Sequence, residues 1–282
     1  MSSPTLQIRV PASTSNIGPG FDVLGMAVDR YLDIRLLEAS GDAGDSNWRL
    51  YDADESHLAV RTFREAGGSG RVSVSSTIPP ARGLGFSGAA RAAGLFAAAV
   101  QQGSSIDEAR DDVFARAAEL EGHADNVAAS IYGGVTVVVD GVVEPLPLGC
   151  EFAVVLWIPA NSSGTDASRQ VLPRQYGRGD VVFNIGRVGL LAAALANGTV
   201  DRLGIASEDR LHQEQRLVDL PESADALQKA RGGGAYCAWL SGSGPTVAAL
   251  CDPSTAGQVA SRLPEDAEIA IATIDHRGAR CR

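Results

Sequence analysis

An α+β fold with two lobes is predicted for this chain of 282 residues. Short β-branched or alternating runs, typical of strands, are mixed in irregular order with alanine-rich and amphipathic segments, typical of helices. A chain of this length buries a substantial core and is more often two modest units than one. The strongly apolar run Phe152–Ile158 begins what reads as a second half, so we place a boundary near Cys150, between lobes of residues 1–149 and 150–282.

The first half contains strands and helices around two glycine-containing loops. Alanine has the highest helix propensity, and carboxylates at the start of a segment suit a helix N-terminus, which predicts two helices. The polar segment Asp42–Glu55 is expected to be a surface connection and Gly67–Gly70 a turn. The elements expected here are the strands Leu6–Val10, Val72–Ile78 and Val135–Val139, the loop Pro11–Phe21, and the helices Gly88–Val100 and Asp107–Glu121.

The second half begins and ends with strands. Its apolar runs are five to seven residues long, as expected for buried strands, and its helical segments lie between them. The elements expected here are the strands Phe152–Ile158, Tyr236–Leu240, Val247–Cys251 and Ile269–Ile274, helices between Ala167 and Ala196, and a helix over Thr255–Leu263.

Composition excludes several classes of function. Hydrophobic residues make up 45% and charged residues 21%, as in an ordinary globular protein. The net charge of −10, with no cluster of Lys and Arg, argues against nucleic acid or an anionic membrane as a partner. No apolar segment of about 18 residues and no signal-peptide pattern is evident, so a cytoplasmic protein is expected. The cysteines form no C-x-x-C pair, which indicates neither a zinc site nor a disulfide framework: Cys150, Cys237, Cys251 and Cys281.

A glycine-rich loop before the alanine-rich helix is the first candidate for chemistry. Gly83, Gly85 and Gly88 let the backbone approach an anion, and the helix N-terminus that follows offers unpaired N–H groups. The spacing matches neither the G-x-x-x-x-G-K-[ST] loop nor the G-x-G-x-x-G fingerprint. A strand-to-helix turn without a ligand is the alternative, although the Ser87 hydroxyl could reach a phosphate or Mg²⁺.

Three motifs in order resemble the GHMP kinase superfamily, which includes galactokinase, homoserine kinase, mevalonate kinase and phosphomevalonate kinase. They are Pro11-Ala-Ser-Thr-Ser-Asn-Ile-Gly-Pro-Gly-Phe-Asp-Val-Leu-Gly25, the glycine-rich loop, and Ser241-Gly-Ser-Gly-Pro-Thr246. Within the superfamily, four further segments are similar to the homoserine kinase family, and the match spans essentially the whole chain: Gly122-His-Ala-Asp-Asn126, Tyr132-Gly-Gly134, Leu172-Pro-Arg-Gln-Tyr176 and Asp275-His-Arg-Gly-Ala-Arg280.

The resemblance implies a fold and an activity. The N-terminal lobe would be like the second domain of ribosomal protein S5 and the C-terminal lobe ferredoxin-like, with ATP and Mg²⁺ between them. The reaction implied is phosphorylation of the side-chain hydroxyl of L-homoserine to O-phospho-L-homoserine, in threonine biosynthesis. Two alternatives stay open, namely another kinase of the superfamily acting on mevalonate or shikimate, and a non-catalytic ligand-binding relative. The resemblance also implies a homodimer, which no residue pattern indicates by itself.

The resemblance assigns the nucleotide and metal to particular residues. Mg²⁺ prefers hydroxyl, carboxylate and water oxygens, and Ser87 and Glu119 match the family's metal positions, with Glu121 open as the alternative carboxylate. A solvated glutamate at a helix end is the structural reading of Glu119. The residues expected at ATP are Pro80, Arg82, Gly83, Leu84, Gly85, Phe86, Ser87, Gly88 and Ala89.

Homoserine has a carboxylate, an ammonium and a hydroxyl, so its site needs an arginine fork, an acidic acceptor and a polar group at the alcohol. By resemblance, Arg169 and Arg216 clamp the carboxylate, Asp22 takes the ammonium, and Asn126 lies at the reacting hydroxyl as a catalytic residue with Ser87 and Glu119. Turn-forming, capping or surface roles are the alternatives. The full set of expected substrate residues is Asn16, Asp22, His123, Asp125, Asn126, Thr165, Arg169, Arg216, Ser243 and Gly244.

The chain departs from the family pattern at three positions. Phe86 replaces a serine and Gly88 an alanine in the glycine-rich loop, so one phosphate-facing hydroxyl is absent and weaker ATP binding is expected. His57 stands where relatives carry an asparagine near the adenine. The sole lysine, Lys229, lies outside every motif, so we expect the γ-phosphate or solvent, rather than a strong base, to accept the proton of the hydroxyl.

Overall fold

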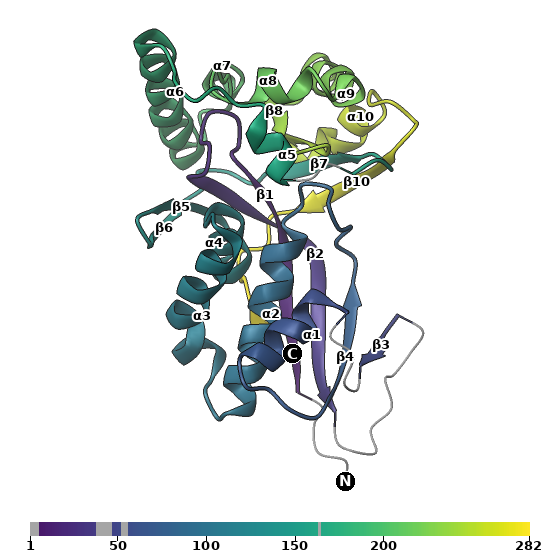
Figure 1. Ribbon diagram of the computed structural model, residues 1–282. Helices are drawn as coiled ribbons and strands as arrows, with labels where there is room; N and C mark the ends of the chain where they lie inside the picture. Colours follow the sequence, from purple (N-terminus) through teal and green to yellow (C-terminus); the bar gives the residue numbers. More distant parts are fainter. Residues whose placement is uncertain (1–5, 38–46, 52–55, 163–164) are drawn as a thin grey trace.

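The protein consists of two lobes stacked end to end (Figure 1). The computed structural model describes residues 6–37, 47–51, 56–162 and 165–282, and for residues 165–167 only the backbone is described. The two-lobed α+β architecture predicted from the sequence is confirmed.

The N-terminal lobe is built on an antiparallel sheet, which has seven strands in the described residues. Their order is β11-β1-β2-β4-β3, and β5 pairs with the other part of the long strand β2 and with β6. The strands are β1 (Gln7–Ser15), β2 (Leu24–Leu37), β3 (Arg49–Tyr51), β4 (Arg71–Ser76), β5 (Val135–Val139), β6 (Val142–Leu146) and β11 (Arg280–Cys281).

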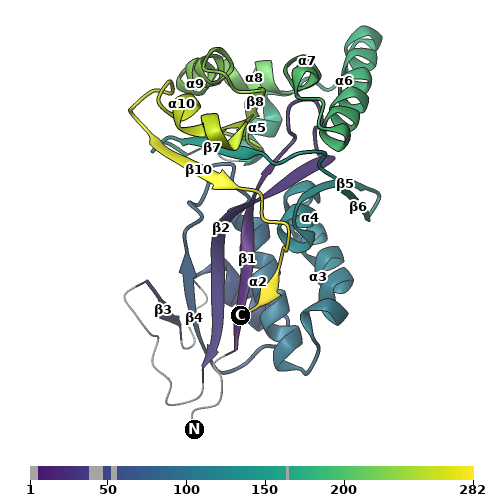
Figure 2. The ribbon, with the colours of Figure 1, turned by 180° about the vertical axis from the view of Figure 1, so that it is seen from behind.

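Helices α1 to α4 cover one face of this sheet (Figure 1), and the other face is seen in Figure 2. The central helix α2 packs against β1, β2 and the other three helices. Its alanine side chains allow these close contacts, and ten of its residues are buried. Ser105 begins α3 with a capping box to Glu108. The helices are α1 (Leu58–Glu65), α2 (Phe86–Gln101), α3 (Ile106–Glu121) and α4 (Asp125–Tyr132).

The C-terminal lobe has an antiparallel sheet in the order β10-β7-β9-β8, with helices packed on it. Its strands are β7 (Ala153–Ile158), β8 (Cys237–Leu240), β9 (Val247–Cys251) and β10 (Glu268–Thr273). Its helices are α5 (Thr165–Gln170), α6 (Arg178–Asn197), η1 (Val200–Arg202), α7 (Leu203–Ala206), α8 (Gln213–Leu217), α9 (Pro221–Gly232), η2 (Pro253–Thr255) and α10 (Ala256–Ala260).

Helix α6 carries exposed apolar side chains. Within the described residues it is the one helix long and apolar enough to span a membrane. This is weak evidence for a membrane span, because core helices of soluble proteins can have the same length and composition. Leu191 and Leu195 are buried, whereas Val182 and Ile185 are exposed.

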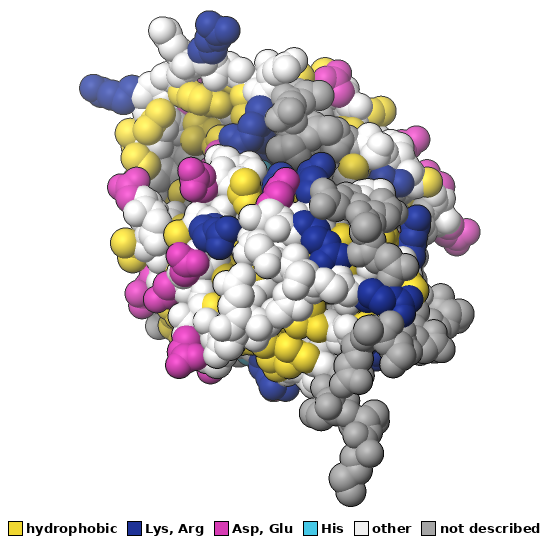
Figure 3. All heavy atoms as spheres, turned by 60° about the horizontal axis from the view of Figure 1, so that its bottom comes forward, with side chains coloured by type: hydrophobic (Ala, Val, Ile, Leu, Met, Phe, Trp, Pro, Cys, Tyr) yellow, Lys and Arg dark blue, Asp and Glu magenta, His cyan; other side chains and the backbone are white. Residues whose placement is uncertain are grey.

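Acidic and basic side chains lie side by side on the face seen in Figure 3, so the net charge of −10 is not concentrated there.

The structure corrects the expectation that residues 11–21 form one loop. Residues 11–15 continue β1 and pair with β2, and the loop begins only at Asn16. The pairing register shifts between Pro11 and Ala12, where proline has no N–H to donate. Ser13, Thr14 and Ser15 are all buried, so the polar–apolar alternation that marks a half-exposed strand is missing.

Other expected elements differ mainly at their ends. The expected helix over Thr255–Leu263 is shorter, because α10 begins at Ala256, directly after η2, and ends at Ala260. The segment Asp42–Glu55 contains β3, and its residues 42–46 and 52–55 lie outside the described residues. The elements that the sequence did not predict are β2, β3, β6, β11, α1, α4, η1, α7, α8 and α9.

The chain does not separate cleanly at residue 150. The boundary expected near Cys150 falls between β6 and β7, but after β10 the chain returns to the first sheet, where β11 pairs with β1 (Figure 2). Asp275 fixes this return. Its carboxylate lies 2.9 Å from the Arg280 guanidinium and accepts hydrogen bonds from the Tyr31 hydroxyl and from the N–H groups of Arg277 and Gly278.

We expect Asp275→Asn to lower the free energy of unfolding near pH 7 by about 2–3 kcal/mol, because it removes a buried charge from Arg280. Burial raises the pKa of the Asp275 carboxyl, but the hydrogen bonds from Arg280, Tyr31 and Arg277 outweigh it and hold that pKa below its ordinary value. The carboxylate therefore stabilises the fold above its unfolded pKa, and this contribution is lost as the pH falls below about 4.

Urea denaturation of the wild type and Asp275→Asn at several pH values measures this effect. The difference in stability should shrink from pH 7 towards about pH 3. Glu144→Gln, at an exposed position on β6, is the control and should change stability by less than about 0.5 kcal/mol. A difference that does not depend on pH would contradict the assigned role of the carboxylate.

Candidate active site

A cleft of about 250 Å³ opens between the two lobes. Strand β1, the loop after it, the glycine-rich loop, the ends of α3 and α4, and helices α5 and α8 all contribute to its walls. The lining residues are Ser15, Asn16, Asp22, Ala81, Arg82, Gly83, Gly85, Phe86, Ser87, Glu121, His123, Asp125, Asn126, Arg169, Arg216, Gly242 and Ser243.

The glycine-rich loop needs glycine because backbone and side-chain atoms of other segments come very close. A Cβ atom on Gly83 would lie 2.2 Å from the Ser241 carbonyl oxygen, and one on Gly85 would lie 2.2 Å from the Ser13 hydroxyl. Both residues also have positive φ. Helix α2 begins at Phe86, directly after Gly85, and the N–H groups of its first turn have no partners within the helix. Because Phe86 and Ser87 line the cleft, this helix end faces it.

The structure brings five of the nine expected nucleotide residues to the cleft: Arg82, Gly83, Gly85, Phe86 and Ser87. Leu84, Gly88 and Ala89 are not among the lining residues, because Leu84 packs into the core and the other two lie on the buried face of α2. Pro80 does not line the cleft, whereas Ala81 does.

Arg82 bridges the lobes, because its guanidinium donates to the carbonyl oxygens of Pro159 and Ala160. The Phe86 ring stands edge-on to His57 at 5.8 Å between centroids, and the Tyr51 ring lies 5.6 Å from His57. Burial lowers the pKa of His57. An aromatic group therefore stands at the position of the missing serine.

Ser87 is paired with Glu121 rather than with Glu119. The Ser87 hydroxyl donates to Glu121 Oε2 over 2.6 Å, and Arg91 forms an ion pair with the same carboxylate. Glu119 lines a separate small pocket beside α1. The structure thus does not bring Glu119 to the cleft, and the alternative left open by the sequence is the carboxylate found there.

A hydroxyl and a carboxylate side by side fit Mg²⁺, which takes oxygen ligands and shares them with substrate phosphates. In the part of the chain that is described, no group of three His, Cys, Asp or Glu residues could hold a metal ion alone. A metal at Ser87 and Glu121 would therefore need further oxygens from water or a ligand.

Asn126, in the first turn of α4, is held in place by two serines of β1. Its Oδ1 accepts a hydrogen bond from the Ser13 hydroxyl, and its Nδ2 donates to Ser15 Oγ, each over 3.0 Å. Asp125 accepts from the Asn126 N–H and lies 3.2 Å from Nδ1 of His123. The hydrogen bond with Asp125 raises the pKa of His123.

Asp22 and Arg169, expected at opposite ends of the substrate, are paired with each other. The Arg169 guanidinium donates to both carboxylate oxygens of Asp22, over 2.9 and 2.7 Å. Both side chains are about one-third exposed, at 36% and 35%. Asp22 has a φ of 58°, and its N–H donates to Asn16 Oδ1, which holds the carboxylate at the edge of the cleft.

Arg216 is the buried cation of the cleft. It is 4% exposed, its Nε donates to the Ser168 carbonyl, and its Nη1 donates to the Gly242 carbonyl. Within the described residues no hydrogen bond to its Nη2 is found, and no carboxylate forms an ion pair with it. Burial lowers the pKa of Arg216, and the nearby Asp22 carboxylate raises it without reversing that direction.

Two family models match the chain, GHMP kinases N terminal domain over residues 55–134 and GHMP kinases C terminal over residues 191–269. A homoserine kinase of Streptomyces coelicolor is 38% identical over 97% of this chain and 93% of its own. The chain belongs to the GHMP kinase superfamily, in its homoserine kinase family. A homoserine kinase of Thermus thermophilus is 36% identical over 96% of this chain and 92% of its own.

Solved structures confirm the GHMP kinase fold. A homoserine kinase from Cytophaga hutchinsonii superposes with a TM-score of 0.82 at 26% identity, covering 100% of this chain and 98% of that one. A mevalonate kinase from Methanococcus jannaschii gives a TM-score of 0.69 at 14% identity, with coverage of 97% and 99%, and shows the shared fold alone.

Most of the expected substrate residues of this GHMP kinase line the cleft, with two exceptions. Gly244 does not line the cleft, because it packs against the side chains of Leu240 and Leu220. Gly242 lines the cleft instead, and its carbonyl oxygen accepts a hydrogen bond from the Asn16 amide. The side chain of Thr165 lies outside the described residues. The cleft residues that line the wall as expected are Asn16, Asp22, His123, Asp125, Asn126, Arg169, Arg216 and Ser243.

Sequence reasoning missed three residues that hold the side chains of Asn126 and Arg216 in place. Ser13 and Ser15 fall in the first motif, but their contacts with Asn126 cross more than 110 residues. His212 lies behind Arg216 in a segment that resembled the family only as a stretch bearing an arginine. The signal that could have found it is its position four residues before Arg216 on one helical face.

Proposed function

We propose that this GHMP kinase transfers the γ-phosphoryl group of ATP to the side-chain hydroxyl of L-homoserine, giving O-phospho-L-homoserine and ADP in threonine biosynthesis. The observation that carries the proposal is Arg216, a buried guanidinium without a carboxylate partner among the described residues, in the same cleft as a glycine-rich helix N-terminus. The carboxylate of an amino acid that carries an alcohol would be the anion at Arg216, and a triphosphate would be the anion at the helix N-terminus.

The nucleotide half relies on backbone N–H groups, since no lysine lies in any motif. We assign the phosphates to the loop at Gly83 and Gly85 and to the first turn of α2, where unpaired N–H groups and the helix dipole favour negative charge. Mg²⁺ is assigned to Ser87 and Glu121, and the chemistry it supplies when bound is neutralisation of charge on the phosphates.

The homoserine half uses three groups. Arg216 takes the carboxylate, Asp22 the ammonium, and the Asn126 amide lies at the hydroxyl. Since Arg169 already binds Asp22, homoserine must insert beside this ion pair or separate it. A part-exposed pair contributes only about 0–1 kcal/mol, so its separation is compatible with ordinary substrate affinity.

No strong base is required in this arrangement. Among the described residues that line the cleft, His123 carries the imidazole, and its Nδ1 lies 3.2 Å from the Asp125 carboxylate, so this ring nitrogen is already paired. Asn126 has no basic atom, so its role is alignment of the hydroxyl. In the proposed step the hydroxyl oxygen forms a bond to the γ-phosphorus, the bond to the ADP oxygen breaks, and the hydroxyl proton passes to a phosphate oxygen or to solvent.

A coupled ADP-release assay with purified protein and MgATP tests this proposal. L-homoserine should give the highest kcat/KM, with L-serine, mevalonate and shikimate far lower. A preference for mevalonate or shikimate would support another activity of the superfamily, and binding of homoserine without ADP release would support a non-catalytic relative.

The cellular setting follows from the same proposal. A kinase that consumes ATP and a free amino acid is expected in the cytoplasm. A homodimer stays a prediction from the family resemblance, which light scattering of the purified protein can check.

A further inference from the structure

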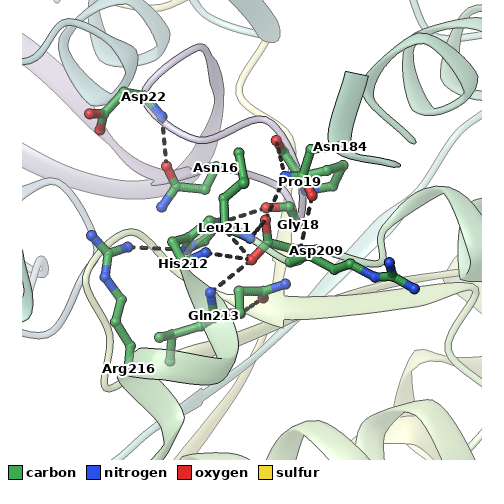
Figure 4. A network of polar contacts seen from close by, with 12 residues as sticks. Asn16, Gly18, Pro19, Asp22, Asn184, Asp209, Leu211, His212, Gln213 and Arg216 are labelled. Atoms are coloured by element: carbon green, nitrogen blue, oxygen red, sulfur yellow. Dashed lines mark hydrogen bonds and ion pairs between the residues drawn. The ribbon is translucent and has the colours of Figure 1, made fainter. Parts of the chain in front are cut away.

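A buried histidine joins the two parts of the cleft expected to hold opposite ends of homoserine. His212 lies just before α8 and is 0% exposed. Its Nε2 lies 2.8 Å from the carbonyl oxygen of Gly18, in the loop after β1, and its Nδ1 lies 3.1 Å from Nη1 of Arg216 (Figure 4).

The two neighbours determine which nitrogen carries the proton. The Gly18 carbonyl can only accept a hydrogen bond, so Nε2 must donate to it. A guanidinium can only donate, so Nδ1 must present a lone pair to Arg216. Both contacts are satisfied only by the neutral imidazole protonated at Nε2.

The surroundings of the His212 ring favour its neutral form. Burial is the largest influence and lowers the pKa of His212, and Arg216 lowers it further, whereas Asp209, the Gly18 carbonyl and Asp22 raise it. Asp209 Oδ2 lies 3.7 Å from Nε2. A second proton would have to sit on Nδ1, against the Arg216 guanidinium, which like-charge repulsion opposes.

The position of the ring is fixed from both sides. The Asp209 carboxylate accepts hydrogen bonds from the Asn184 amide and from the N–H groups of His212 and Gln213, which holds the start of α8. Phe21 stacks on the imidazole with 4.9 Å between centroids, and the Arg216 guanidinium lies 5.2 Å from the Phe21 ring (Figure 4 shows the polar part of this network).

We propose that His212 is a positioning residue that sets the Arg216 guanidinium for the substrate carboxylate and holds it in register with the loop that carries Asp22. The inference rests on the proposed homoserine kinase activity. Nη1 of Arg216 is shared between the Gly242 carbonyl and His212, so the fork is turned with Nη2 left for an anion. The same ring holds Gly18, four residues before Asp22, so one side chain fixes the spacing between the carboxylate site and the ammonium site.

Two substitutions separate the two contacts of the ring. His212→Asn places an amide near Nδ1, where its oxygen can accept from Arg216. His212→Gln places an amide near Nε2, where its nitrogen can donate to Gly18 but nothing accepts from Arg216. We expect His212→Gln to raise KM for homoserine about tenfold with little change in KM for ATP, and His212→Asn to stay closer to the wild type.

The decisive measurement compares homoserine with 3-aminopropan-1-ol (propanolamine), which is homoserine without its carboxylate. The wild type should prefer homoserine strongly by kcat/KM, His212→Asn should keep most of that preference, and His212→Gln should lose about tenfold of it. His276→Gln, at an exposed histidine outside the cleft, is the matched control and should keep wild-type selectivity. Equal selectivity in all four proteins would overturn the proposal, as would equal losses in the Asn and Gln variants, because a purely structural role predicts the latter.

A measurement on the wild type keeps the proposal testable even if the variants fold poorly. The chain has four histidines, so ¹⁵N chemical shifts of labelled imidazoles can be resolved. His212 should be neutral, protonated at Nε2, and unchanged across neutral and mildly acidic pH. A charged ring or the Nδ1–H form would overturn the proposal. Failure of the wild type to phosphorylate homoserine would instead refute the proposed function, which the selectivity of the variants does not test.

Discussion

Glu121→Gln is expected to lower kcat about 100-fold or more, with a higher concentration of Mg²⁺ needed for half-maximal rate. The Glu121 side chain is only 6% exposed and is held by Ser87 and Arg91, so the carboxylate is already oriented towards the cleft before any ligand binds. The amide is similar in size and keeps hydrogen-bonding capacity but has no charge. The loss would therefore report the missing negative charge rather than a change of shape.

Glu119→Gln is the matched control, two residues earlier on the same helix. Glu119 lies at a separate pocket, so kcat and the Mg²⁺ requirement should stay close to the wild type. Initial rates at saturating homoserine and a series of Mg²⁺ concentrations measure both. If Glu119→Gln lost the activity and Glu121→Gln kept it, the assignment of the carboxylate would be reversed.

These two glutamates illustrate a limit of sequence reasoning. Both end the same predicted helix, and two residues correspond to about 200° around a helix axis, so they face nearly opposite sides. Choosing between them requires the rotation of α3 relative to the glycine-rich loop, which depends on packing against α2 and α4. The sequence indicated a carboxylate beside Ser87, but the packing decided which one.

The glycine-rich loop was predictable because its reason is local. Positive φ at Gly83 and Gly85, followed at once by an alanine-rich helix, is encoded within a few residues. Strand β2 was not, because charged residues interrupt its apolar pattern. Asp33 is buried on β2 and forms an ion pair with Arg9 of β1 over 2.8 Å, so its partner is known only when the strands pair. The contact between His212 and Gly18 likewise joins positions 194 residues apart.

The largest effect on homoserine binding is expected from Arg216→Ala, which should raise KM for homoserine at least tenfold and leave KM for ATP nearly unchanged. A buried charge-assisted hydrogen bond contributes about 1.5–3 kcal/mol, which corresponds to about 10- to 150-fold in affinity. Arg216 meets the condition for this range, since it is 4% exposed and its described contacts are with carbonyl oxygens and a neutral imidazole rather than a carboxylate.

Two further variants separate charge from geometry. Arg216→Lys keeps the positive charge but not the planar fork, so it cannot bond Gly242, His212 and a carboxylate together, and its KM should lie between those of the wild type and Arg216→Ala. Arg210→Ala removes a guanidinium that is 52% exposed on the same lobe and should change KM by less than about threefold. Wild-type homoserine kinetics in Arg216→Ala would remove this arginine from the site. The other arginines in the described lining of the cleft are Arg82 and Arg169. Arg82 is bonded to backbone carbonyls, and Arg169 is paired with Asp22. Binding of the substrate carboxylate by Arg169 would therefore require this ion pair to break.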